Sequence, residues 1–157
     1  MILDKRTEFC DGTALNTGAA GTYVIGDQVD LGVARDIGNG QSLSWEVRVL
    51  TGINAAAAGT VTFQLVSADN AALTTNPVVH AQTSAFTTST TSGNAGGALA
   101  AGTTLAVIDL PQEGPAYKRY LGVRQVTGTS AISAGAVDSF LTPVVAGWKA
   151  YDAPWQA

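Results

Sequence analysis

Apolar and polar residues alternate along several stretches of the chain. The pattern is clearest in residues 43–50 (LSWEVRVL), 60–66 (TVTFQLV) and 104–110 (TLAVIDL). Because successive side chains of a strand point to opposite sides, a period of two predicts a strand with one buried face. Shorter strand candidates, rich in β-branched residues, lie at residues 22–25, 78–83, 120–126 and 136–142. The apolar faces predict a core that includes Trp45, Val47, Phe63, Leu65, Ile108, Leu121 and Val123.

Turn-forming and polar segments separate the predicted strands. Asn39–Gly40 is a turn signal, and residues 67–77 form a long polar connection. The Thr-, Ser-, Gly- and Ala-rich residues 87–102 predict an exposed flexible loop. The one helical candidate, residues 53–59 (INAAAAG), is short and lacks apolar periodicity. Residues 119–142 contain two apolar runs separated by a short polar stretch, and we expect them to form a hairpin at the centre of the sheet.

These patterns predict an all-β fold, either an antiparallel jelly roll or a β-sandwich, because short strands recur and no sustained helix is indicated. A chain of 157 residues fits a single domain with arms. The ends differ from the middle, since charge gathers near the start and residues 147–157 hold two of the three tryptophans. We therefore expect an N-terminal arm (1–10), a β domain (11–142) and a C-terminal aromatic tail (143–157).

Charge is scarce in this sequence. Charged residues make up 13% of the chain and the formal net charge is −4, so no basic footprint for nucleic acid is present. A surface with little charge resists association weakly, which predicts that partners cover much of it. The sequence has no apolar run long enough to span a membrane. The opening MILDKRTEF lacks the apolar stretch of a signal peptide, so we expect synthesis in a cytoplasm without export by the usual route.

The residue inventory argues against an enzyme. His80 is the single histidine and Cys10 the single cysteine, whereas acid–base catalysis and zinc binding need partners at a suitable spacing. We expect His80 to lie on a strand face or rim and Cys10 to be a buried small residue. The scattered aspartates, Asp27, Asp30, Asp36 and Asp69, are interpreted as solvated turn carboxylates. No catalytic, metal or cofactor-binding residue is predicted.

Aromatic and arginine residues are the candidates for binding. Three aromatics gather in the tail beside Gly and Pro, and they dock either on their own domain or on a partner, where aromatic anchors contribute strongly. Arginine is also frequent at interface hot spots, although solvated strand-face arginines are common. The predicted partner-interface residues are Leu3, Arg35, Arg119, Arg124, Trp148, Tyr151 and Trp155.

Several fragments in order resemble the capsid cement, or decoration, proteins of certain tailed bacteriophages. They are MILDK at the start, VDLGVARDIGNGQSLSWEVRV (29–49), TVTFQLVSADNAAL (60–73), LP (110–111) and KRYLGVRQVTGTSAISAGAVDSFLT (118–142). The resemblance covers roughly residues 1–142, and the tail WKAYDAPWQA departs from it. It implies a jelly-roll-like domain outside a shell of major capsid protein, without catalysis or cofactors.

The resemblance further implies a location on the virion surface and a role in holding capsid subunits together against internal DNA pressure. We expect self-association on the shell as a dimer or trimer, and no direct contact with nucleic acid or membrane. The alternative from another class is a carbohydrate-binding β-sandwich, an adhesin or lectin-like module. Its site would use Tyr117–Lys118 or the tail aromatics.

Overall fold

The computed structural model of the chain describes residues 5–34, 37, 42–91, 97–111 and 113–143. A short 3-10 helix, η1 (Lys5–Thr7), precedes the strands. The strands are β1 (Glu8–Ala14), β2 (Gly21–Asp30), β3 (Leu43–Ala55), β4 (Gly59–Ala68), β5 (Val78–Gln82), β6 (Phe86–Thr88), β7 (Thr104–Asp109), β8 (Tyr120–Gly128) and β9 (Ile132–Pro143).

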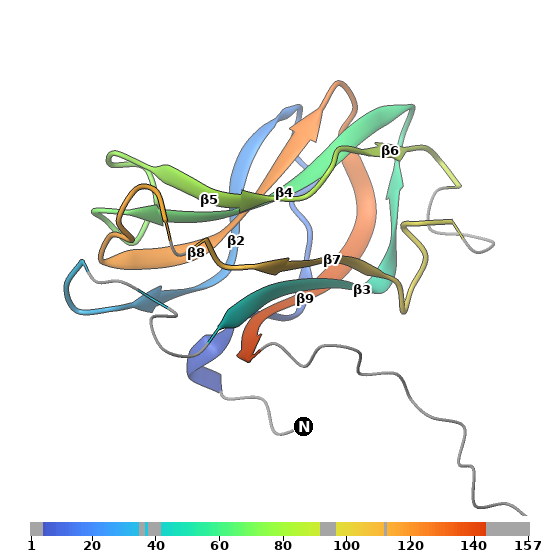
Figure 1. Ribbon diagram of the computed structural model, residues 1–157. Coiled ribbons are helices and arrows are strands. Elements are labelled where there is room, and N and C mark those ends of the chain that lie inside the picture. The colour runs from blue at the N-terminus through green and yellow to red at the C-terminus, as the bar shows by residue number, and fades with distance from the viewer. Residues whose placement is uncertain (1–4, 35–36, 38–41, 92–96, 112, 144–157) are drawn as a thin grey trace, which may run out of the picture.

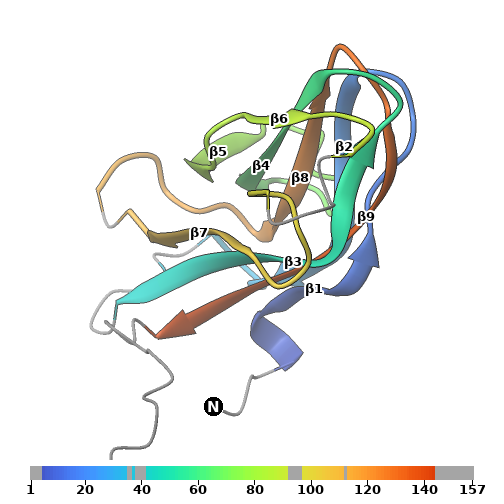
Figure 2. The same ribbon diagram turned by 90° about the vertical axis from the view of Figure 1, so that its right-hand side faces the viewer.

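The strands form two antiparallel sheets that pack as a sandwich (Figures 1 and 2). The four-stranded sheet has the order β1-β9-β3-β7, and the five-stranded sheet has the order β2-β8-β4-β5, with β6 also paired to β4. Consecutive strands lie in opposite sheets, except that β4, β5 and β6 all belong to the five-stranded sheet. This connection of two sheets is the jelly-roll form of a β-sandwich, and the predicted all-β fold is confirmed.

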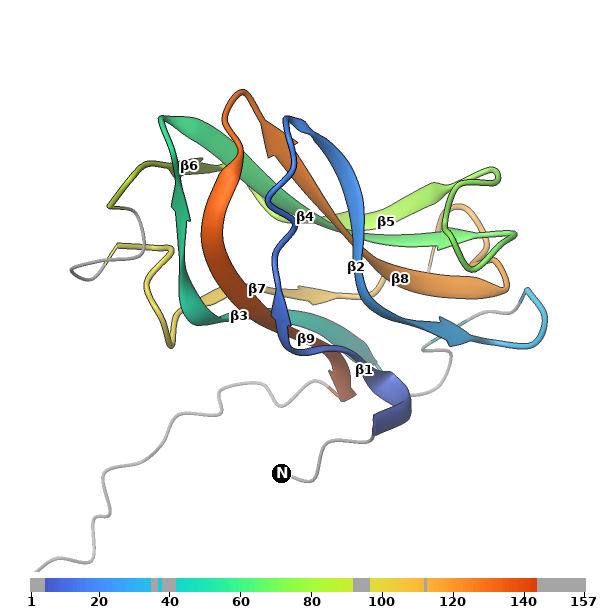
Figure 3. The same cartoon turned by 180° about the vertical axis from the view of Figure 1, so that it is seen from behind.

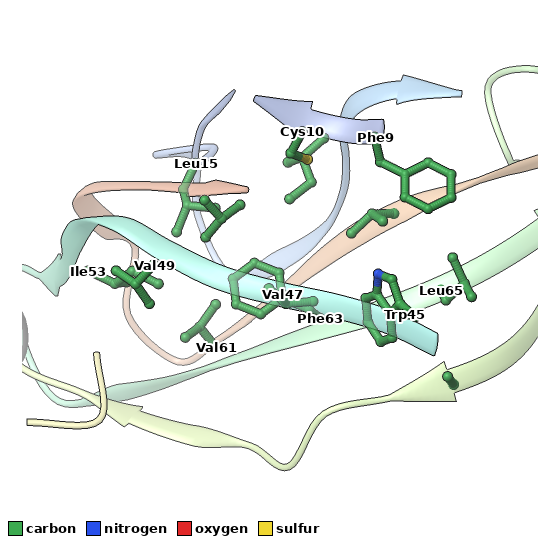
Figure 4. Close-up of a cluster of buried hydrophobic side chains, with 14 of the residues drawn as sticks. Phe9, Cys10, Leu15, Trp45, Val47, Val49, Ile53, Val61, Phe63 and Leu65 are labelled. Carbon is green, nitrogen blue, oxygen red and sulfur yellow. The ribbon is translucent and has the colours of Figure 1, made fainter. Parts of the chain in front are cut away.

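The alternating apolar residues of the long strands meet between the sheets. Figure 4 shows Trp45 and Val47 of β3 close to Phe63 of β4. The indole Nε1 of Trp45 donates to Ser139 Oγ of β9 at 2.8 Å, which satisfies the polar atom of this buried ring. Of the residues expected in the core, those that are buried are Trp45, Val47, Phe63, Leu65, Leu121 and Val123. Ile108 is only partly buried, because β7 is the edge strand of its sheet.

The first strand, β1, belongs to the sandwich and was not among the strands predicted from the sequence. β1 starts at Glu8, which pairs with Phe140 of β9, and the side chains of Phe9 and Cys10 are buried. β1 also packs beside β2 (Figure 3). Residues 8–10, which we assigned to an arm, are therefore part of the folded domain, because their pairing and burial depend on a strand more than a hundred residues away.

The predicted hairpin over residues 119–142 is wrong. β8 lies between β2 and β4 in the five-stranded sheet, whereas β9 lies between β1 and β3 in the other. The short link between them carries the chain across the sandwich, with Thr129 at a positive φ of 67°. Each strand gains two partners in this way, whereas a local hairpin would leave the β1 and β3 edges unpaired.

Two other segments are more ordered than expected. Residues 53–55 complete β3 and β4 starts at Gly59, so the Ala run forms a bend rather than a helix. In the segment 87–102, Thr88 lies in β6 and Leu99 is buried, with the Leu99 carbonyl accepting from the backbone N–H of Ile53 at 2.9 Å. The described parts of this segment are thus attached to the core, and residues 92–96 lie outside the described residues.

Candidate interaction surfaces

Arg119, a predicted interface residue, pairs within its own chain. Its Nε donates to Asp30 Oδ1 at 2.9 Å and its Nη2 donates to Asp30 Oδ2 at 2.8 Å. The guanidinium also lies 5.0 Å from the centre of the Tyr120 ring. The Arg119 guanidinium, helped by the Gly32 N–H, lowers the pKa of Asp30 to about 2. Asp30 is therefore the counter-charge that aligns the ends of β2 and β8, not an isolated turn carboxylate.

Arg124 lies on the outer face of the five-stranded sheet. Its strand neighbours Val123 and Gln125 point inward and are buried, so the alternation of β8 turns Arg124 outward. A row of direct cross-strand partners runs through it across β2, β8, β4 and β5: Val24, Arg124, Gln64 and Gln82. Gln64 Nε2 donates to Gln82 Oε1 at 2.7 Å.

The guanidinium of Arg124 stands apart from other charges. Within the described residues it has neither an ion-pair partner nor a hydrogen-bond partner. Partial burial lowers its pKa. By contrast, Lys5, Arg48, Lys118 and Arg119 each lie within 4.0 Å of a carboxylate oxygen.

The outer face of the four-stranded sheet is acidic. A second row of direct partners crosses β1, β9, β3 and β7: Glu8, Phe140, Glu46 and Val107. Val107 is 60% exposed. Asp109 lies on the same face, two residues from Val107, and accepts a hydrogen bond from Ser44 Oγ at 2.6 Å.

The remaining charges of this face are only partly balanced. Asp138 is the cross-strand neighbour of Arg48 in the β3–β9 register, and its Oδ1 accepts from the backbone N–H of Gly12 at 2.7 Å. Arg48 Nε lies 3.5 Å from Glu46 Oε1, and Lys5 Nζ lies 2.7 Å from Glu8 Oε2. Carboxylates outnumber cations on the described face, and Asp109 has an exposed side chain with no cation beside it among these pairs.

His80 lies in β5 and packs against Ser67 of β4 and Tyr117. The backbone N–H of Lys118 donates to Ser67 Oγ at 3.0 Å, so the Ser67 hydroxyl proton is available to His80 Nε2 at 2.7 Å. The His80 ring stacks on Tyr117 with centroids 3.8 Å apart. Burial lowers the pKa of His80. Ser67 is fully buried and cannot reach a substrate, so these contacts join β4, β5 and the segment before β8.

The connection between β4 and β5 folds onto the outer face of the five-stranded sheet. Lys118 Nζ donates to Asp69 Oδ2 at 3.2 Å and to the Asn76 carbonyl at 2.7 Å, which holds the two ends of the loop together. Leu73 is fully buried, and a Cβ at Gly122 would lie 2.8 Å from its Cδ1. The polar pattern of residues 67–77 did not reveal this, because Leu73 is a single apolar residue.

Several other predicted features can now be placed. Tyr117 is buried, so its ring is not presented to a sugar. Cys10 is also buried, and burial raises the pKa of its thiol to about 12. The predicted interface residues outside the described part of the chain are Leu3, Arg35, Trp148, Tyr151 and Trp155.

The described residues contain no cluster of three or more His, Cys, Asp or Glu side chains suited to a metal ion. In the same residues, none of the helices has the length and apolar character needed to cross a membrane.

Comparison with known proteins gives one family. The Bbp16 family model matches residues 9–141, which span the sandwich from β1 to the end of β9. No curated protein matches the chain.

Proposed function

The chain belongs to the Bbp16 family, and we propose that it is a structural capsid-decoration protein. In this proposal it binds the outer surface of a tailed-phage shell and stabilises contacts between major capsid protein subunits. It acts without catalysis or a cofactor, and it is made in the host cytoplasm before it joins the virion.

The observation that carries the proposal is the distribution of side chains between the core and the sheet faces. The single histidine and the single cysteine are held in packing. Exposed apolar side chains stand instead on the sheets, with Val24 on one outer face and Val107 on the other. Sheet faces with exposed apolar and charged groups suit binding to another protein surface.

The resemblance to capsid cement proteins supports the same function. Its longest fragment, residues 118–142, supplies β8 and most of β9, which are inner strands of the two sheets. The resemblance therefore extends through the centre of the domain and is not limited to a loop. A decoration protein is present in many copies, so modest contacts of each copy add up over the shell.

The proposal is tested by co-sedimentation with DNA-free shells assembled from the major capsid protein of the same phage. We expect saturable binding at a fixed ratio to capsid subunits, and shells that resist heat better when decorated. Shells of an unrelated capsid protein are the control. Absence of binding to the matched shells would overturn the proposal, and binding to a glycan array in its place would support the carbohydrate-binding alternative.

A further inference from the structure

The two outer faces of the sandwich complement one another in charge, because one carries Arg124 and the other carries an excess of carboxylates. We propose that the outer face of the five-stranded sheet of one copy docks on the acidic outer face of the four-stranded sheet of a second copy. Arg124 of the first copy then pairs with the exposed Asp109 of the second. This contact between copies does not depend on the capsid role.

The first argument is that Arg124 has no counter-charge among the residues that the structure describes. A partly buried guanidinium without a counter-charge loses hydration and gains no ion pair in return, so a carboxylate from outside the chain stabilises it. Its row partners Val24, Gln64 and Gln82 carry no charge that could do this. The flanking amides of Gln64 and Gln82 already bond to each other, which leaves Arg124 as the charged group of the row.

The acidic face supplies the matching groups. Glu46 and Val107 are direct cross-strand partners, and Asp109 lies two residues further along the same face of β7. The exposed Val107 with the exposed Asp109 beside it on the same strand is the counterpart of Arg124 beside the exposed Val24. Apolar contact at the centre with charge pairing around it is a common arrangement of protein interfaces.

The symmetry of the contact follows from the position of the two faces. A two-fold pairing of the Arg124 face with itself would bring two guanidinium groups together without carboxylates, which is repulsive. Both complementary faces occur on each copy, on opposite sides of one sandwich. The contact is therefore head-to-tail, and it makes a ring if the rotation closes and a chain if it does not.

Sedimentation equilibrium of the purified full chain tests the inference without any capsid. We expect reversible association between about 10 µM and about 1 mM, weaker at high than at low salt because the pair is screened. Arg124→Gln should weaken association about tenfold or more, since the loss of a close charge pair has effects of this order. Arg119→Gln is the matched control, because it removes the same charge from an arginine outside the row, and it should associate like the unchanged protein.

Exchanging the charges at positions 124 and 109 distinguishes the loss of this contact from misfolding of a variant. Arg124→Glu alone should abolish association, and a mixture of the Arg124→Glu and Asp109→Arg proteins should restore it between unlike copies. Circular dichroism melts check that each variant is folded. A chain that stays monomeric at the highest concentration, or an Arg124→Glu protein that associates as well as the control, overturns the inference. Neither result bears on shell binding, which is measured separately.

Discussion

Thr88 brings a hydroxyl into the interior of the sandwich. Its Oγ1 is buried and has no hydrogen-bond partner within the described residues. A buried polar atom left in this state costs about 1–3 kcal/mol, so Thr88→Val, which keeps the shape, is expected to raise the free energy of unfolding by about 1 kcal/mol. Urea denaturation measures the change.

Thr83 provides the matched control for this prediction. It is also buried, but its Oγ1 accepts from the backbone N–H of Phe63 at 3.1 Å and donates to the Ser84 carbonyl at 2.9 Å. Thr83→Val should therefore lower the free energy of unfolding by about 1–2 kcal/mol. Equal effects of the two substitutions would show that the Thr88 hydroxyl is satisfied.

His80 gives the domain a pH dependence. Burial lowers its pKa below the ordinary value of 6.5, so the unfolded chain binds the proton more readily than the folded one. Stability is then fully present above the unfolded value and is lost as the pH falls through the folded pKa. As the only histidine, His80 should account for the loss between about pH 7.5 and about pH 5.5, a window in which ordinary carboxylates stay ionised.

The measurement is the free energy of unfolding across this window for the protein and for His80→Gln. The glutamine offers an oxygen to the Ser67 hydroxyl but does not titrate, so the slope should disappear. A histidine ring signal that titrates at or above 6.5 in the folded protein would contradict the prediction.

The two candidate arginines show the limit of sequence reasoning at this scale. Arg119 and Arg124 lie five residues apart in similar surroundings of the sequence. One is neutralised by Asp30, which is 89 residues away in the chain, and the other has no counter-charge in the described residues. Only the pairing of strands distinguishes them, and that pairing is set by long-range packing.

At the scale of elements, Gly26 is where β1 and β2 come together. Its φ is +66°, and a Cβ there would overlap with the carbonyl oxygen of Phe9 and crowd Cys10 Sγ. Gly26→Ala would force the two backbones apart, so we expect a loss of about 3 kcal/mol or more, as for severe overpacking with backbone strain.

Gly32 serves as the control that separates the cost of the backbone conformation from the cost of the steric overlap. It has a similar φ of +77°, but a Cβ added there would meet no atom within 4 Å. Gly32→Ala should cost only about 1 kcal/mol, from the backbone conformation alone. Thermal melts of both variants measure the difference, and similar melting temperatures would mean that β1 can move away from β2 without loss.

The elements themselves were largely foreseeable, but their partners were not. The period of two in LSWEVRVL and TVTFQLV fixes which side chains of β3 and β4 face the core, because an inward Trp45 or Phe63 requires that phase. The sequence of residues 128–132 is compatible both with a hairpin turn within one sheet and with a crossover between the two sheets. Choosing between them requires knowledge of the distant β1 and β3, which occupy both sides of β9.

At the scale of the whole molecule, every strand of the described residues lies before residues 147–157, since β9 ends at Pro143. Removal of residues 147–157 should therefore leave the melting temperature nearly unchanged. If the tail aromatics bind the shell, its removal should reduce retention on shells, since an aromatic anchor contributes about 2 kcal/mol or more. A melt of the free protein beside quantification of protein retained on purified shells measures both effects.

The substitutions Trp148→Ala and Trp155→Ala serve as the milder versions of this deletion. They should reduce retention in the same direction without shortening the chain. A lower melting temperature with unchanged retention would show that the tail packs on its own domain.

The pairing of β1 with β9 has a mechanical consequence. The two strands are antiparallel neighbours with Glu8 opposite Phe140, so the start of one lies beside the end of the other. Tension applied between the start of β1 and the end of β9 would load the hydrogen bonds between these strands one after another, so the strands would separate sequentially from that end. Force spread over a sheet face is shared by all the strands beneath it. A shell under pressure would thus be held firmly through the faces of this domain and only weakly by tethers pulling on its two ends.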